Sequence, residues 1–120
     1  MKLTRTFTFS AAHHLTDYYG ECERPHGHTY RLTVAVEGPV GKDGLIVDFA
    51  ALKKFVEKKV LEKVDHRDLN DFFENPSAEN IAIWIWKSLK NAGKDLKRGV
   101  TLKEITLWEG DNTSVTYAGD

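Results

Sequence analysis

Two stretches of alternating residues constrain this chain more than any other feature of its sequence. Between Leu3 and His13, mostly apolar residues fall on the face that ends in His13, and threonines with Ser10 fall on the other. Between Thr29 and Glu37 the even-numbered positions are apolar. Because side chains in a strand point alternately to its two sides, both stretches predict strands with one buried face.

The residues after these two strands show the spacing of apolar side chains that is typical of helices. The stretch VDFAALKKFVEKKVLEKV places apolar residues on one stripe, and Asp48 at its start is a suitable N-cap. A second helix is predicted to begin near Pro76 and Ser77 and to end near Gly93. Strands are predicted again over 100–109 and 114–118, joined by a tight GDNT turn. The order ββααββ predicts an α+β fold, a four-stranded antiparallel sheet with two helices on one face. Such a sheet has open edges, which oligomer formation would cover.

Length and composition predict one domain over residues 1–120. Apolar residues make up 41% and charged residues 29%, as in ordinary globular proteins. The net charge of -1, without a basic stripe, argues against nucleic acid as a partner. No apolar run suits a signal peptide or a membrane span, so we expect neither. The single cysteine, Cys22, is consistent with a reducing compartment, and we expect a cytoplasmic protein.

Three histidines are placed to meet at one end of the predicted sheet. His26 and His28 lie two residues apart, so a strand points both imidazoles to one face. His13 extends the apolar face of the first strand. If the two strands pair, the three rings converge, and three neutral imidazoles suit a tetrahedral zinc site with one open position. Because a lone His-x-His motif is common without a metal, the third histidine is what favours this interpretation.

Two further residues invite interpretation. Cys22 could be a fourth ligand that closes the zinc site, a buried thiol without a role, or an acid–base group beside the metal. The residues alone leave all three open. Glu109 shares the register of Ile105 and Leu107, so alternation points its carboxylate to the apolar side, where it needs a partner. A solvated glutamate at a strand end is the alternative.

Six segments, in order along the chain, resemble the family of 6-pyruvoyl-tetrahydropterin synthases and 6-carboxytetrahydropterin synthases. They are FTFSAAHHL, CERPHGHTY, GLIVDFAALK, VDHRDLND, NPSAENIAIWIW and TLWEGDNTSVTY. The resemblance covers essentially the whole length. It implies the tunnelling fold, in which the sheets of three subunits close into a barrel and two trimers stack into a homo-hexamer.

The resemblance also implies roles for individual residues. The family's zinc ligands match His13, His26 and His28. Its catalytic residues match Cys22, Asp65 and His66, with Asp65 orienting His66 as a proton relay. Its pterin-anchoring glutamate matches Glu109, and Ser77 and Glu79 at the start of the second helix are expected to bind substrate. Because active sites of this family lie between subunits, the Asp-His pair is expected to serve a neighbour's zinc.

The three residues between Cys22 and His26 carry finer information. This short gap is typical of the 6-carboxytetrahydropterin synthases that supply queuosine and related deazapurines. It implies conversion of 7,8-dihydroneopterin triphosphate to 6-carboxytetrahydropterin, acetaldehyde and triphosphate. The family alternatives are a 6-pyruvoyl-tetrahydropterin synthase and an aldolase-like activity on dihydroneopterin, and the non-enzymatic alternative is a zinc-binding assembly module. Two positions depart from the family's usual sequence. His14 stands where the family commonly has arginine, and Ser77-Ala78 stand where the start of the second helix is usually rich in threonine and serine. Both departures affect the expected contacts with the substrate.

Overall fold

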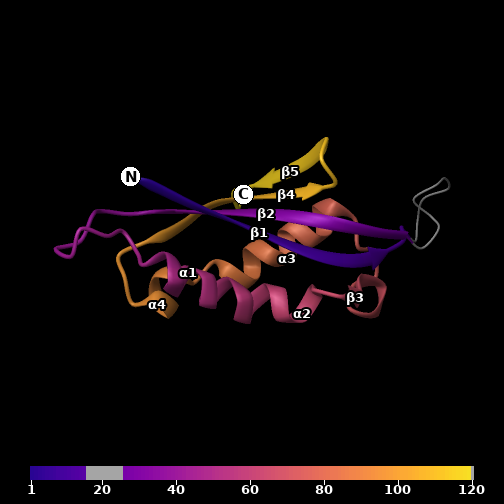
Figure 1. Ribbon diagram of the computed structural model, residues 1–120, viewed down its shortest axis with the longest axis horizontal. Helices are drawn as coiled ribbons and strands as arrows, with labels where there is room; N and C mark the ends of the chain where they lie inside the picture. The colour runs from indigo at the N-terminus through magenta and orange to yellow at the C-terminus, as the bar shows by residue number, and fades with distance from the viewer. Residues whose placement is uncertain (16–25, 120) are drawn as a thin grey trace.

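The computed structural model of the chain is a five-stranded sheet with helices on one face (Figure 1). The structure describes residues 1–15 and 26–119, and for residue 26 the backbone alone. The strands are β1 (Lys2–His13), β2 (His26–Glu37), β3 (Arg67–Asp68), β4 (Thr101–Glu109) and β5 (Thr113–Tyr117). They lie in the order β3-β1-β2-β4-β5.

The four predicted strands are present, and their pairs are antiparallel as expected. The fifth, β3, was not predicted: it pairs in parallel with β1 through Ala11 and Ala12, which makes the sheet mixed. Two residues are too few to carry an alternating pattern, so β3 leaves no periodic signal in the sequence. Its position is fixed instead by contacts with β1, including the His66 N–H that donates to the Ser10 carbonyl at 2.6 Å.

The helices form two continuous stretches and one short addition. The first stretch comprises α1 (Phe49–Val56), a π-helical turn η2 (Glu57–Leu61) and α2 (Glu62–Val64). As predicted, the Asp48 side chain caps α1, accepting from the Ala50 N–H at 2.9 Å. A 3-10 turn, η3 (Leu69–Asp71), follows β3. None of the helices in the described part of the chain is long and apolar enough to cross a membrane.

The second predicted helix ends earlier than expected. It is α3 (Ala78–Leu89), capped by Ser77, and a separate α4 (Ala92–Leu96) follows. Gly93 therefore lies inside α4 and does not end α3. A Cβ at Gly93 would collide with the Val100 carbonyl oxygen, so this glycine allows α4 to pack closely on the chain entering β4.

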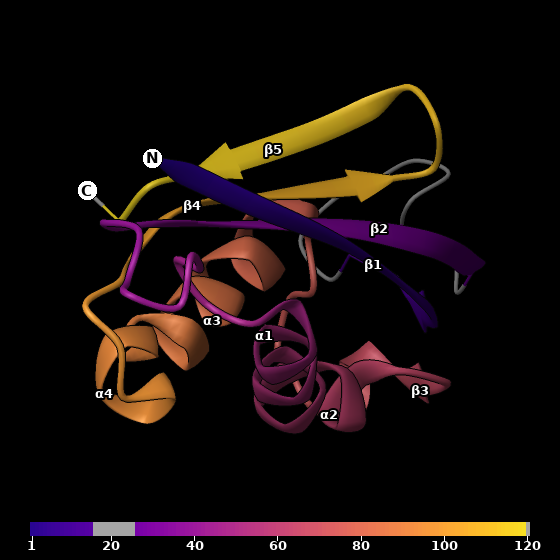
Figure 2. The ribbon, with the colours of Figure 1, turned by 60° about the vertical axis from the view of Figure 1, so that its left-hand side comes forward.

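The helices cover the face of the sheet that carries the apolar register (Figure 2). Alternation puts Phe9, Tyr30, Leu32, Ile105 and Leu107 on this face, and all are buried. The opposite face is rich in threonine, with cross-strand hydroxyl pairs Thr6–Thr33 at 3.1 Å and Thr106–Thr116 at 3.0 Å. The apolar core therefore continues along the sheet up to the end where the histidines lie.

Candidate metal centre

The register of β1 and β2 determines which side chains meet at the end of the sheet. His13 lies opposite residue 26, and Ala11 lies opposite His28. The rings of His13 and His28 consequently approach edge to face, with centroids 4.9 Å apart. The strand pairing on which the predicted convergence depended is thus present, and it brings two of the three predicted ligands together. Residue 26 shares their register, but its side chain lies outside the described part.

His13 is held in a defined orientation. Its side chain is only 2% exposed, and its Nδ1 lies 2.7 Å from the Pro76 carbonyl oxygen just before α3. A carbonyl oxygen can only accept, so Nδ1 is the donor, and in the neutral ring Nε2 is the nitrogen with the lone pair. This is the arrangement by which proteins fix the tautomer of a metal-binding histidine. Sequence reasoning missed Pro76 as an orienting residue, because the contact joins positions 63 residues apart.

Glu109 at the end of β4 completes the group. It lies opposite Tyr30 across β2 and β4, and its Oε1 is 3.1 Å from His28 Nε2 and 3.9 Å from His13 Nε2. One ligand atom from each of His13, His28 and Glu109 lies within 4.8 Å of the other two. Two imidazoles and a carboxylate suit a divalent ion such as Zn²⁺, so the residues present fit the predicted metal. The predicted inward direction of Glu109 is observed, but its proximity to the histidines was not foreseen.

Tyr30 lies directly beneath this group. Its ring stacks on Phe9 at 4.9 Å and meets the rings of His13 and His28 edge to face, at 6.0 and 5.7 Å. Its buried hydroxyl has no hydrogen-bond partner in the described part of the chain. Burial and, to a lesser degree, the negative charge of Glu109 raise the pKa of Tyr30 far above its ordinary value. Tyr30 is therefore a neutral, rigid support for the two imidazoles.

Asp65 and His66 lie together at the edge of β1. The Oδ1 of Asp65 accepts from the Ser10 N–H at 3.0 Å and lies 3.0 Å from Nδ1 of His66. Asp65 thereby anchors the pair to β1 and orients the imidazole. His66 has a left-handed backbone with φ of 60°, and its side chain is 82% exposed. Left-handed backbone is costly for a residue with a Cβ and is concentrated at functional sites.

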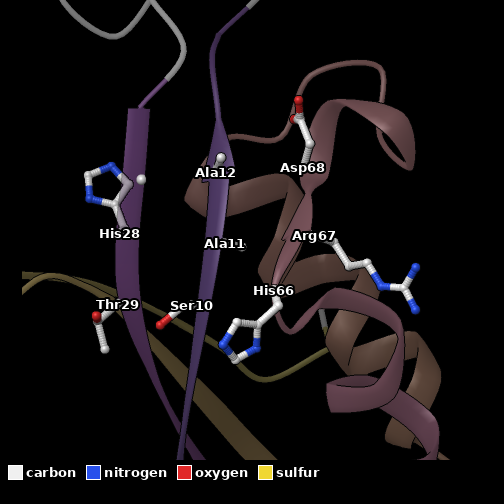
Figure 3. A pocket seen from close by; sticks show the side chains of 9 residues that line it. Ser10, Ala11, Ala12, His28, Thr29, His66, Arg67 and Asp68 are labelled. Carbon is white, nitrogen blue, oxygen red and sulfur yellow. The ribbon is translucent and has the colours of Figure 1, made fainter.

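His66 borders a cavity of about 550 Å³ that also reaches residues of β1 and β2. Figure 3 shows His66 beside Ser10, with His28 across β1 on the neighbouring strand. Ser10 is out of register with Ala11 and His13, so its side chain belongs to the opposite face of the sheet. His28 and His66 nevertheless line this same cavity, and the exposed ring of His66 is available to a neighbouring molecule.

Comparison with known proteins agrees with this geometry. A family model described as 6-pyruvoyl tetrahydropterin synthase matches residues 2–120. The chain belongs to this family. A dihydroneopterin monophosphate aldolase of Pyrococcus furiosus is 44% identical over 108 residues, 90% of this chain and 89% of the relative. A 6-carboxy-5,6,7,8-tetrahydropterin synthase of Synechocystis is 38% identical over 96 residues, 74% of each chain.

The family's structures share the fold. The 6-pyruvoyl tetrahydropterin synthase of Caenorhabditis elegans superposes with a TM-score of 0.87 at 31% identity, covering 100% of this chain and 96% of that one. The α+β tunnelling fold inferred from the sequence is thus confirmed, with five strands where four were expected. The resemblance inferred from the six motifs is confirmed as well.

The remaining predicted site residues fall in three places. Ser77 caps α3, its hydroxyl accepting from the Asn80 N–H at 3.1 Å. Glu79 is exposed and borders, with Ala78 and Glu109, a second cavity of about 210 Å³. Cys22 lies outside the described residues. Of the sequence-derived substrate residues, Glu79 thus shares a cavity with Glu109, whereas the hydroxyl of Ser77 caps α3.

Proposed function

We propose that this protein is a zinc-dependent 6-carboxytetrahydropterin synthase. In this reaction 7,8-dihydroneopterin triphosphate yields 6-carboxytetrahydropterin, acetaldehyde and triphosphate. The observation that carries the proposal is the grouping of His13, His28 and Glu109, whose ligand atoms lie within 4.8 Å at one end of the sheet. The 38% identical Synechocystis synthase supports the carboxypterin product. The product would supply queuosine or a related deazapurine in the cytoplasm.

In this proposal His13, His26 and His28 hold the zinc ion. When bound, zinc supplies Lewis-acid stabilisation of the oxyanion charge that develops on the substrate side chain. His13 is prepared for this role because the Pro76 carbonyl occupies Nδ1 and leaves Nε2 to the metal. The stacked rings of Tyr30 and Phe9 lie against the site, and their apolar surroundings strengthen the electrostatic interactions of the metal and its ligands.

Glu109 anchors the pterin ring. A carboxylate offers two acceptor oxygens, which match the paired N–H donors on the aminopyrimidine edge of a pterin. The cavity that Glu109 shares with Ala78 and Glu79 gives this edge a place to enter. Glu109 Oε1 lies 3.1 Å from His28 Nε2. A pterin ring bound to Glu109 would therefore lie beside the histidines, with the substrate's side chain close to the metal.

Proton transfer belongs to Cys22 and to the Asp65–His66 pair. Cys22 acts as the base beside the metal, where a positive environment favours the thiolate. Asp65 orients His66 as a relay, and the exposed imidazole serves the metal site of an adjacent subunit. The assembly in this proposal is a homo-hexamer made of two trimers, each with its sheets closed into a barrel, and it binds a small pterin rather than nucleic acid.

A second candidate is an aldolase that splits dihydroneopterin monophosphate. It is favoured by the 44% identity to the Pyrococcus enzyme over 90% of this chain. Both reactions break the substrate's side chain and need the same acidification of its hydroxyl groups. They differ in the fragments: the aldolase would leave a hydroxymethylpterin and a glycolaldehyde fragment.

Product analysis tests the proposal. The zinc-loaded protein is incubated separately with 7,8-dihydroneopterin triphosphate and monophosphate, and the products are identified by mass spectrometry. We expect 6-carboxytetrahydropterin and acetaldehyde from the triphosphate, and no turnover by His28→Ala. Hydroxymethylpterin from the monophosphate would establish the aldolase instead. A pyruvoylpterin product would also contradict the proposal.

A further inference from the structure

The backbone of His14, directly after the candidate ligand His13, is bound by a single side chain. Asn70 Oδ1 accepts from the His14 N–H at 2.8 Å, and Asn70 Nδ2 donates to the His14 carbonyl oxygen at 3.1 Å. The same Nδ2 lies 3.3 Å from Nε2 of the His14 ring. One primary amide thus satisfies both backbone groups of this residue, as a neighbouring strand would.

This clamp continues the pairing of β1 past the point where β3 ends. Backbone pairing between β1 and β3 stops at Ala12 and Asp68, and the turn η3 begins at the next residue. The Asn70 amide takes over two positions further along. Asn70 is itself fixed, because its N–H donates to Asp68 Oδ1 at 3.0 Å and the neighbouring Leu69 is fully buried.

His13 therefore lies between two anchors. Its backbone is followed at once by the Asn70 clamp, and its ring is tied at Nδ1 to the Pro76 carbonyl oxygen. If the backbone anchor is lost, the end of β1 is free to move, and the contact with Pro76 alone does not fix the position of Nε2. A misplacement of a fraction of an ångström matters to a metal site, because outer contacts commonly contribute 10- to 100-fold to metal affinity.

We propose that Asn70 is a positioning residue of the metal centre, which holds His13 in place by clamping the backbone of His14. The inference rests on the zinc site of the proposed function but concerns a residue that contacts neither metal nor substrate. Outer contacts contribute about 10- to 100-fold to metal affinity, and because Asn70 acts through the backbone we expect the lower figure, about tenfold in zinc affinity.

The test compares Asn70→Ala with Asp48→Ala, which removes a side-chain-to-backbone hydrogen bond at the remote cap of α1. Zinc affinity is measured by competition with a chromophoric chelator, well below each melting temperature. We expect a roughly tenfold weaker zinc affinity in Asn70→Ala and less than a twofold change in Asp48→Ala. Equal affinity in both variants and the wild type would overturn the inference. A wild-type protein that binds no zinc would instead contradict the proposed function.

A measurement on the wild type does not depend on how a variant folds. Coupling between two sites is reciprocal, so a clamp that favours zinc binding is itself favoured by zinc. We expect the His14 amide hydrogen to exchange slowly without metal and about tenfold more slowly with zinc. Fast exchange without metal, or exchange that zinc leaves unchanged, would overturn the assignment.

Discussion

The carboxylate of Glu109 can bind either the metal centre or the pterin ring. Its Oε1 lies 3.1 Å from His28 Nε2, close enough for a charge-assisted hydrogen bond or for joint coordination of a metal. It also borders the cavity next to Ala78 and Glu79, where a pterin edge could bind. The proposal assigns the zinc to three histidines and reserves Glu109 for the pterin. Substitution of this residue separates the two roles.

We expect Glu109→Gln to keep its zinc and to bind pterin at least about tenfold more weakly, a loss of roughly 1.4 kcal/mol. The substitution keeps the shape but replaces one acceptor with a donor aimed at the donors of the pterin. Zinc is measured by metal analysis, and pterin affinity by titration of a product-like pterin. Loss of zinc would identify Glu109 as a ligand, and unchanged pterin affinity would show that the ring is held elsewhere.

A second prediction for a single residue concerns Tyr30. Its hydroxyl is buried without a hydrogen-bond partner in the described part of the chain, and leaving such a group unpaired costs about 1–3 kcal/mol. Tyr30→Phe removes the hydroxyl and keeps the stacking on Phe9. We expect the free energy of unfolding to stay the same or to rise by about 1 kcal/mol in urea titrations. A fall of more than about 1 kcal/mol would mean that the hydroxyl is bonded.

Among the elements, the periodic ones were predictable and the aperiodic ones were not. Alternation located β1 to within one residue because one of its faces is buried from Phe7 onwards and less exposed than the other before it. The alternating apolar pattern of β2 begins only at Thr29, three residues after the strand itself, because glycine and histidines interrupt the pattern there. β3 was missed because it depends on tertiary contact with Ser10. The histidine pair was predictable from register, whereas the Pro76 and Asn70 contacts depend on chain segments far away in sequence.

The loop after β2 is fastened to the segment after α4 by Arg98. Its guanidinium donates to both carboxylate oxygens of Asp43, at 3.0 and 3.2 Å, and to the carbonyl oxygens of Leu45 and Ile46. The hydrogen bonds from Arg98 are the main reason that the pKa of Asp43 is lowered. A lowered pKa in the folded state stabilises the fold above the unfolded value of about 4, and this contribution disappears as the pH falls through the folded pKa.

We therefore expect Asp43→Asn to lower the melting temperature at neutral pH, by an amount that stays constant down to about pH 5. Below about pH 4 the difference from the wild type should shrink, because protonated Asp43 no longer attracts Arg98. Melting curves across this range provide the measurement, with Asp111→Asn in the exposed β4–β5 turn as control. A difference that persists unchanged at pH 2 would contradict the ion-pair explanation.

At the scale of the whole molecule, the described sheet has two open edges. β3 pairs with only two residues of β1, so the first half of β1 forms an edge, and β5 forms the other. Exposed edges of this kind are normally covered in native proteins. The exposed His66 lies beside Ser10 on the β1 side of the sheet. The proposed trimer would cover the edges and complete the sites together.

Mixing two inactive variants tests the shared sites. His28→Ala lacks a zinc ligand and His66→Ala lacks the relay, so each assembly alone should be inactive. If a site takes His28 from one subunit and His66 from the next, random mixed assemblies should recover about a quarter of the wild-type turnover. The two chains are co-refolded and assayed for carboxypterin. No recovery would mean that both residues act within one chain or that subunits do not exchange.

The proposed function requires an open zinc site made of imidazoles, with Cys22 beside the metal and not bound to it. X-ray absorption at the zinc edge measures this directly on the loaded protein. We predict a first shell of nitrogen and oxygen only, at about 2.0–2.1 Å, with the outer scattering of imidazole rings. A sulfur ligand at about 2.3 Å would show that Cys22 closes the site, and the chain would then hold a structural zinc instead of a catalytic one.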